Sequence, residues 1–98
     1  MKHILVRYRT KPDQADANQR LIEAVFQELR TKQPDGVRYL ALRLDDDTFV
    51  HFAAAGDDNP IPSLDAFRAF QADIKERCID PPQPGQATIV ADYRMLAE

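Results

Sequence analysis

His51 is the residue whose type and position best suit chemistry near neutral pH. It lies in the apolar run FVHFA at positions 49–53, and an unperturbed imidazole has a pKa of about 6.5. Such a side chain can serve as a general base or can bind a ligand. A structural histidine, hydrogen-bonded within its own core, is the alternative. The sequence therefore makes His51 the candidate catalytic residue and leaves the structural role open.

Arg7, His3 and Tyr39 are the candidate residues for substrate binding. Arg7 and His3 belong to the segment HILVRY at positions 3–8. A guanidinium can hold a carboxylate or a phenolate, and an ion pair across a subunit interface is the alternative role. His3 also fits a half-exposed position in a strand. Tyr39 can orient an aromatic ligand or donate a hydrogen bond, whereas packing within its strand is the structural alternative.

The sequence predicts neither a metal site nor a cofactor site. The acidic segment 45–47 begins like a calcium loop, but Val50 stands where that loop requires glycine and Gly56 where it requires glutamate. Two histidines and one cysteine have no recognisable zinc spacing. The three glycines form no glycine-rich turn of the kind that cradles phosphate.

Composition indicates a single ordered domain over residues 1–98, because 44% hydrophobic and 30% charged residues are ordinary values for a globular protein. The net charge of -3 gives no general attraction to nucleic acid. Apolar runs are too short to cross a bilayer, and we expect no secretory signal, since residues 1–3 lead straight into the first predicted strand. Cys78 stands alone, which fits a reducing compartment. We expect a cytoplasmic protein with neither nucleic acid nor membrane as a partner.

Residue patterns predict four strands. Residues 3–9 and 37–44 are rich in aliphatic and aromatic side chains, a third strand begins at Thr48, and residues 87–96 form the last strand. Because only the acidic turn separates the second strand from the third, we expect the two to form an antiparallel hairpin.

Two helices separate these strands. The first begins after a candidate N-cap at Asp13 and ends near residue 32, and the second follows Ser63 and ends before the proline-rich segment 80–85. Each helix has one apolar stripe. The stripes consist of Leu21, Ile22, Val25, Phe26 and Leu29 in the first helix and Leu64, Phe67, Phe70, Ile74 and Cys78 in the second. The order βαββαβ is the α+β ferredoxin-like plan, a four-stranded antiparallel sheet with both helices on one face.

The first strand is apolar on both of its faces. We expect Ile4 and Val6 to face the helices. Alternation then places His3, Leu5 and Arg7 on the uncovered face. A second copy of the sheet is the expected cover, so we predict a homodimer whose mixed polar and apolar interior suits a small-molecule cavity.

Three segments carry a family resemblance: HILVRYRTKP at 3–12, FVHF at 49–52 and LDAFRAF at 64–70. With these segments the chain resembles the dimeric α+β-barrel superfamily, and within it the antibiotic-biosynthesis-monooxygenase-like domains, over essentially its whole length. The resemblance implies two sheets that pair into a barrel and a small-molecule pocket. Some members oxidise aromatic polyketides or quinols without a cofactor, some degrade haem or isomerise lactones, and many have no assigned reaction.

The chain departs from the residues that such enzymes often use. Cofactor-free and haem-degrading relatives often have an Asn on the first strand, a Trp near the second helix and a His on that helix. This chain has Leu5 and Gln71 at the corresponding positions and no Trp. A cofactor-independent monooxygenase acting on an aromatic or quinol-like substrate is the reaction that the resemblance suggests, with His51 as base and Arg7 as anion partner. A non-enzymatic ligand-binding or structural dimer is the alternative.

RNA binding is a further alternative, because RNA-recognition motifs share the element order and end their third strand with F-V-x-F. The segment FVHF at 49–52 matches that ending. The acidic residues that precede it would repel a phosphate backbone, and the basic residue and glycine of the motif are missing. The sequence therefore favours a small-molecule ligand over RNA.

Overall fold

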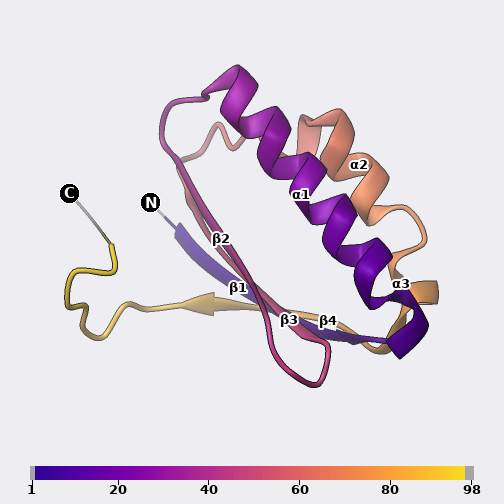
Figure 1. Cartoon of the computed structure of the whole chain (residues 1–98). Coiled ribbons are helices and arrows are strands. Elements are labelled where there is room, and N and C mark those ends of the chain that lie inside the picture. Colours follow the sequence, from indigo (N-terminus) through magenta and orange to yellow (C-terminus); the bar gives the residue numbers. More distant parts are fainter. Residues whose placement is uncertain (1, 97–98) are drawn as a thin grey trace.

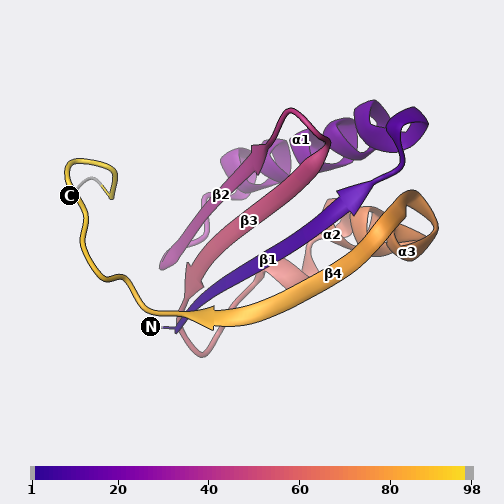
Figure 2. The same ribbon diagram turned by 90° about the horizontal axis from the view of Figure 1, so that it is seen from below.

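The computed structural model describes residues 2–96 and contains a four-stranded antiparallel sheet with its helices on one face (Figure 1). The strand order is β2-β3-β1-β4, with β1 between β3 and β4 (Figure 2). This arrangement confirms the predicted ferredoxin-like fold. In chain order the elements, with η for a short 3-10 helix, are β1 (Lys2–Thr10), η1 (Pro12–Gln14), α1 (Ala15–Lys32), β2 (Val37–Arg43), β3 (Thr48–Ala55), η2 (Ile61–Ser63), α2 (Asp65–Gln71), α3 (Ile74–Arg77) and β4 (Cys78–Ala87).

The predicted hairpin between β2 and β3 is confirmed, and its turn uses the acidic residues. The Asp46 carboxylate accepts a hydrogen bond of 3.0 Å from the backbone N–H of Thr48. Asp47 adopts a positive φ of 66°, a conformation that aspartate tolerates better than most residues. The register places Tyr39 opposite Ala53 and Ala41 opposite His51. Tyr39 and His51 therefore lie on the same face of the sheet.

The helix α1 begins after η1 and ends at Lys32, and the next residue, Gln33, takes the left-handed conformation with φ 47°. The backbone N–H of Gln33 donates to the carbonyl of Leu29 at 2.7 Å, so one of the free carbonyls at the end of the helix is satisfied. The apolar stripe of α1 faces the sheet and buries Ile22 and Val25.

The core lies between the sheet and the helices. Each large aliphatic or aromatic side chain buried there stabilises the fold by roughly 1.5–3 kcal/mol. The buried apolar residues of this cluster are Tyr8, Ala15, Ile22, Val25, Phe49, Leu64, Phe70 and Ile74. The core thus joins the predicted stripes of both helical segments to the even-numbered face of β1.

The prediction of one continuous second helix is wrong, because residues 72–73 divide it into α2 and α3. Asp73 has a φ of 60°, which is outside the helical region. The side chain of Arg77 donates to the carbonyls of Phe70 and Ala72 at 2.6 and 2.9 Å. These bonds satisfy carbonyl groups at the end of α2, so the break carries no cost of buried unpaired groups. The apolar stripe continues across the break, which is why spacing alone did not reveal it.

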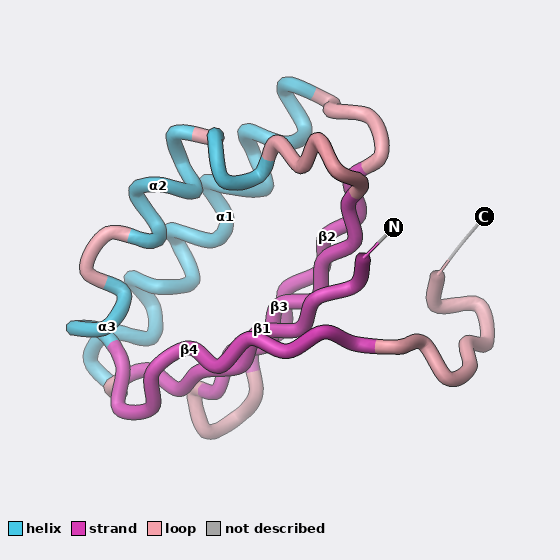
Figure 3. The backbone as a smooth tube through the Cα atoms, turned by 180° about the vertical axis from the view of Figure 1, so that it is seen from behind, coloured by secondary structure: helices cyan, strands magenta, loops and turns pink. Residues whose placement is uncertain are grey.

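The prediction of the last strand over residues 87–96 is also wrong. The strand β4 is instead the proline-rich segment Cys78–Ala87, and residues 88–96 contain no strand. Pro81, Pro82 and Pro84 are tolerated because β4 is an edge strand that pairs only with β1. Beyond β4 the chain runs away from the sheet and the helices (Figure 3).

The two faces of β1 are as predicted. Ile4 and Val6 face the helices, and Leu5 and Arg7 lie on the opposite face. On that outer face Leu5 pairs with Phe52, and Phe52 with Leu40. Leu5 is 37% exposed and Leu40 is 44% exposed. The helices leave this apolar surface uncovered.

A pair of identical substitutions tests the end of α1. Gln33→Gly should raise the free energy of unfolding by about 0.5–1 kcal/mol, because glycine adopts a positive φ without the steric cost of a Cβ. Gln27→Gly, at an exposed position inside the same helix, should lower it by about 0.5–1 kcal/mol. Urea denaturation measures both values. A loss of stability in Gln33→Gly would contradict the left-handed end.

Candidate functional site

A cavity of about 680 Å³ lies between the sheet and the helices. The two layers meet near α3 and diverge towards the loops that follow α1 and β3 (Figure 3). The cavity opens in this wider region, where the loop after β3 contributes to its wall. Its apolar wall includes Ile4, Val6, Ala53, Ile61, Phe67, Phe70 and Ile74. A cavity of this size and character suits a small apolar molecule.

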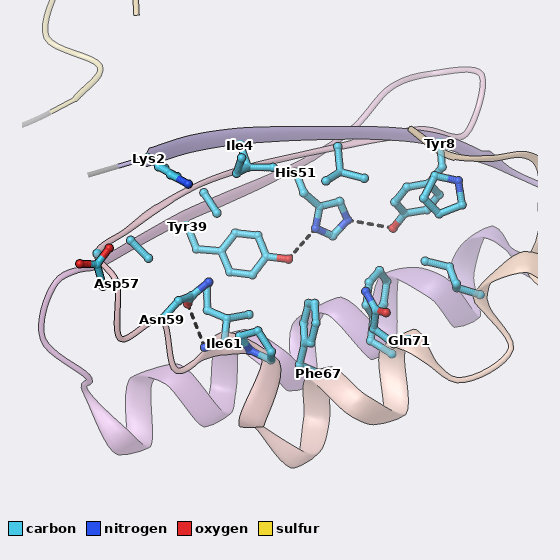
Figure 4. A pocket seen from close by; sticks show the side chains of 18 residues that line it. Lys2, Ile4, Tyr8, Tyr39, His51, Asp57, Asn59, Ile61, Phe67 and Gln71 are labelled. Carbon is cyan, nitrogen blue, oxygen red and sulfur yellow. Dashed lines mark hydrogen bonds between the residues drawn. The ribbon is translucent and has the colours of Figure 1, made fainter. Parts of the chain in front are cut away.

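Tyr39, His51 and Tyr8 form the polar part of the wall and are joined by hydrogen bonds (Figure 4). The Tyr39 hydroxyl lies 2.6 Å from Nδ1 of His51. The Tyr8 hydroxyl lies 2.8 Å from Nε2 of the same ring. Both ring nitrogens of His51 therefore have hydroxyl partners, and all three side chains line the cavity.

This polar group continues into the core through Asn18 and Arg77. The side-chain amide of Asn18 donates to the Tyr8 hydroxyl at 2.9 Å. The guanidinium of Arg77 donates to the Asn18 side-chain carbonyl at 3.1 Å. Asn18 is fully buried, and Arg77 is 8% exposed. Polar groups so deep in the protein are stable only when they are paired, and here each one is.

Burial shifts the pKa of every titratable ring in the group toward the neutral form. It lowers the pKa of His51 to about 4, so the imidazole is neutral at physiological pH. It raises the pKa of Tyr39 to about 12. It also raises the pKa of Tyr8, although the hydrogen bond from Asn18 opposes that shift. The wall thus presents neutral hydroxyl and imidazole groups to a ligand.

A few polar side chains lie near the ends of the cavity. Lys2 and Asp57 lie at one end, and Gln71 lies at the other (Figure 4). Asn59 accepts a hydrogen bond from the backbone N–H of Ile61 at 3.0 Å and thereby shapes the loop that borders the cavity. Gln71, one of the two positions at which the sequence departs from the residues expected from the resemblance, does reach the cavity wall.

The structure brings two of the four predicted site residues together. Tyr39 and His51 are hydrogen-bonded on the cavity wall. His3 and Arg7 do not line this cavity, because they lie on the outer face of β1. His3 stacks there on Phe52, with ring centroids 5.8 Å apart. Any role for His3 or Arg7 in substrate binding therefore concerns the outer face.

Tyr8, Asn18 and Arg77 were not predicted from the sequence as site residues. For Asn18 and Arg77, the spacing of buried residues along their helices does contain a signal. Asn18 stands four residues before the buried Ile22, and Arg77 stands three residues after the buried Ile74. A polar residue at a core position of an amphipathic helix needs a buried partner.

Residues 2–96 contain no helix that combines the length and the apolar character of a membrane span. Within the same part of the chain, no three His, Cys, Asp or Glu side chains are grouped as metal ligands. The side chains that line the described cavity offer hydroxyl, imidazole and amide groups on a mainly apolar wall, with Lys2 and Asp57 at one end.

The fold of the chain is similar to that of several solved structures. No protein-family model matches the chain, and no curated protein matches its sequence. Solved structures do match. One is the structure of Rv0793 from Mycobacterium tuberculosis, with 18% identity, a TM-score of 0.72, and coverage of 93% of this chain and 96% of that one.

Two other similar structures are described as putative antibiotic biosynthesis monooxygenases. The protein from Nitrosomonas europaea has 13% identity and a TM-score of 0.74, with coverage of 91% of this chain and 89% of that one. The protein from Bacteriodes thetaiotaomicron has 10% identity and a TM-score of 0.75, with coverage of 92% and 90%. The chain therefore has the same fold as these solved structures.

The lowered pKa of His51 predicts a loss of stability in mild acid. Below pH 6.5 the unfolded chain takes up a proton on this histidine, whereas the folded protein does so only near pH 4. Acidification therefore favours unfolding within this window. The free energy of unfolding should fall by about 1.5 kcal/mol between pH 6.5 and pH 5.

His51→Gln is the control for this measurement, because it removes the titrating group and keeps both a donor and an acceptor. Its free energy of unfolding should change little over the same pH range. Denaturant titrations at several pH values give the slope of the free energy of unfolding against pH for the wild type and for the variant. Equal slopes for the two proteins would contradict a buried, neutral His51.

Proposed function

We propose that the protein binds a small aromatic or quinol-like molecule in the cavity between sheet and helices and acts on it as a cofactor-independent monooxygenase. The observation that supports this proposal best is the Tyr39 hydroxyl, held by His51 on a mainly apolar wall. A flat ring fits between the aliphatic side chains of β1 and the aromatic side chains of α2. The hydroxyl then orients the ring through its oxygen.

The reaction needs only the substrate and molecular oxygen. One oxygen atom enters a substrate carbon, and the other leaves as water with two hydrogens from the substrate, so the substrate supplies all four electrons. The ionised form of a phenol or quinol is the species that reduces oxygen. A hydrogen bond from Tyr39 stabilises the charge on the substrate oxygen, and the apolar wall excludes water that would weaken this bond.

His51 acts in this proposal through Tyr39. Both of its ring nitrogens are bonded to hydroxyl groups, and burial lowers its pKa to about 4. A group with so low a pKa is a weak base at neutral pH. We therefore propose that His51 positions the Tyr39 hydroxyl rather than touching the substrate, and that an acidic phenol or quinol gives up its proton to solvent on binding.

The hydrogen bonds on both ring nitrogens of His51 also favour a second function, ligand binding without a reaction. A neutral, fully bonded network suits the recognition of a molecule as well as its oxidation. Binding and oxygen uptake must therefore be measured separately.

We also propose that the outer face of the sheet is covered by a second copy of the chain. The support is the row of exposed leucines and their neighbours on β1 and β2. Leu42, at 51% exposure, extends that row. Arg7 and His3 border the same surface, so any part they play in ligand binding depends on this second copy.

Oxygen uptake tests the reaction. With a panel of naphthalene and benzene quinols, the wild type should consume oxygen faster than the spontaneous rate. Tyr39→Phe should lower kcat/KM by about a hundredfold, because it removes the donor to the substrate anion. Tyr93→Phe is the matched control, since Tyr93 is 79% exposed and lies outside the cavity.

Each outcome has a separate meaning. Saturable binding that depends on Tyr39 without oxygen uptake would support the binding function and contradict the monooxygenase. Equal rates in Tyr39→Phe and the wild type would contradict the proposed role of the hydroxyl. Absence of both uptake and binding for the whole panel would contradict the proposed ligand class.

Light scattering over a dilution series tests the dimer. The wild type should have about twice the chain mass of 11.2 kDa. Leu42→Lys should shift the protein towards the monomer, because the exposed charge would lie in the apolar contact. Ala24→Lys, at an exposed position on α1, is the control and should leave the mass unchanged. A stable wild-type monomer at micromolar concentration would contradict the proposal.

A further inference from the structure

Five side chains form one unbroken series of hydrogen bonds from α3 to the cavity. The series runs from Arg77 through Asn18, Tyr8 and His51 to Tyr39. Its four donor–acceptor distances are 3.1, 2.9, 2.8 and 2.6 Å. Because each member has few donors and acceptors, the direction of every bond can be derived from one fixed end.

The fixed end is Arg77. A guanidinium donates hydrogen bonds and cannot accept them. The atom of Asn18 that faces it must therefore be the side-chain oxygen, which leaves the amide nitrogen to face Tyr8 and to donate to its hydroxyl. The opposite orientation of the amide would set donor against donor in a fully buried place.

The bond from Asn18 in turn fixes which partner donates in the hydrogen bond between Tyr8 and His51. The Tyr8 oxygen accepts from Asn18, so its own proton points to Nε2 of His51. Nε2 must accept this bond and carries no hydrogen. The neutral ring keeps its proton on Nδ1 and donates it to the Tyr39 oxygen. The lowered pKa of His51 agrees with a ring that has only this one proton.

The last proton in the series belongs to the Tyr39 hydroxyl. Its oxygen already accepts from His51, and the hydroxyl lies on the cavity wall (Figure 4). Among residues 2–96 no side chain accepts this proton by a hydrogen bond. We infer that the Tyr39 hydroxyl is a dedicated donor, so the cavity selects ligands with an acceptor oxygen, such as a ketone, quinone or phenolate. Asn18 and Arg77, which do not line the cavity, set this preference.

The charge of Arg77 strengthens the same preference. Within the described chain no carboxylate lies within ion-pair distance of Arg77. Its guanidinium is held by the carbonyls of Phe70 and Ala72 and by Asn18. An uncompensated buried cation polarises the hydrogen bonds that lead away from it, and each bond makes the next donor stronger. This inference rests on the proposed binding of a ligand in the cavity.

The substitution Asn18→Asp should reverse the whole series. A carboxylate can pair with Arg77 but cannot donate to Tyr8. The Tyr8 proton must then turn to position 18, and His51 must donate from Nε2. Nδ1 becomes the acceptor for the Tyr39 proton, so the Tyr39 oxygen faces the cavity as an acceptor only.

Nitrogen NMR of protein labelled with 15N-histidine measures the direction at pH 7, with the His3 signal assigned from His3→Gln. The wild type should have the Nδ1–H tautomer of His51, and Asn18→Asp should have the Nε2–H tautomer. Asn59→Asp is the matched control, because Asn59 lies at the cavity outside the series, and it should keep the wild-type tautomer. An Nε2–H tautomer in the wild type would overturn the derived direction, even if the variant did not fold.

Two bicyclic probes of similar size measure the ligand preference. Chromone offers an acceptor carbonyl, and indole offers a donor N–H. The wild type should bind chromone more tightly, and Asn18→Asp should shift the ratio of the two dissociation constants toward indole by at least about tenfold. Tyr39→Phe should lose the preference. An unchanged ratio in Asn18→Asp together with a reversed tautomer would overturn the selectivity while the direction stands.

A failure of the proposed ligand binding would be distinguishable from a failure of the derived hydrogen-bond direction. If neither probe binds the wild type or the variants, both the ligand-binding function and the selectivity inferred from it are contradicted. The tautomer measurement needs no ligand, so it still decides the direction of the series.

Discussion

A single buried cation holds together segments that are distant in the sequence. The guanidinium of Arg77 caps the end of α2 and reaches Asn18 on α1. Its backbone carbonyl accepts the N–H of Lys11, just beyond β1, at 2.8 Å. Removing this side chain would leave several interior polar groups without partners. The end of the fold where sheet and helices meet, and with it the tyrosine–histidine arrangement in the cavity, therefore depends on one residue.

The fold could be predicted over most of the chain because apolar periodicity has a direct physical cause. The continuous second helix and the position of the last strand were mispredicted within residues 72–96, where distant contacts decide the local structure. The helix breaks at Asp73 because Arg77 provides partners for the carbonyls released by the break. The proline-rich strand is possible because the order of strands places it at an edge. Neither condition is visible in a window of neighbouring residues.

The site could be predicted only in part, for a related reason. Tyr39 and His51 were identifiable as single candidates, but their contact depends on the register of the β2–β3 hairpin. A shift of one residue would move one of them to the other face of the sheet. Arg7 and His3 were placed on the correct face. The observed cavity lies on the other face of the sheet, between the sheet and the helices. The break after α2 and the loop after β3 shape this space, and no sequence motif predicts either of them.

The prolines of β4 also have a consequence for how copies of this protein can meet. Pro81, Pro82 and Pro84 carry no backbone N–H, so the free edge of β4 is a poor template for an incoming strand. Sheet extension through this edge, which would lead from one molecule to the next and towards fibres, is discouraged. The dimer proposed above would use the broad face of the sheet instead, and contact between two such faces would close after two molecules and stop growth.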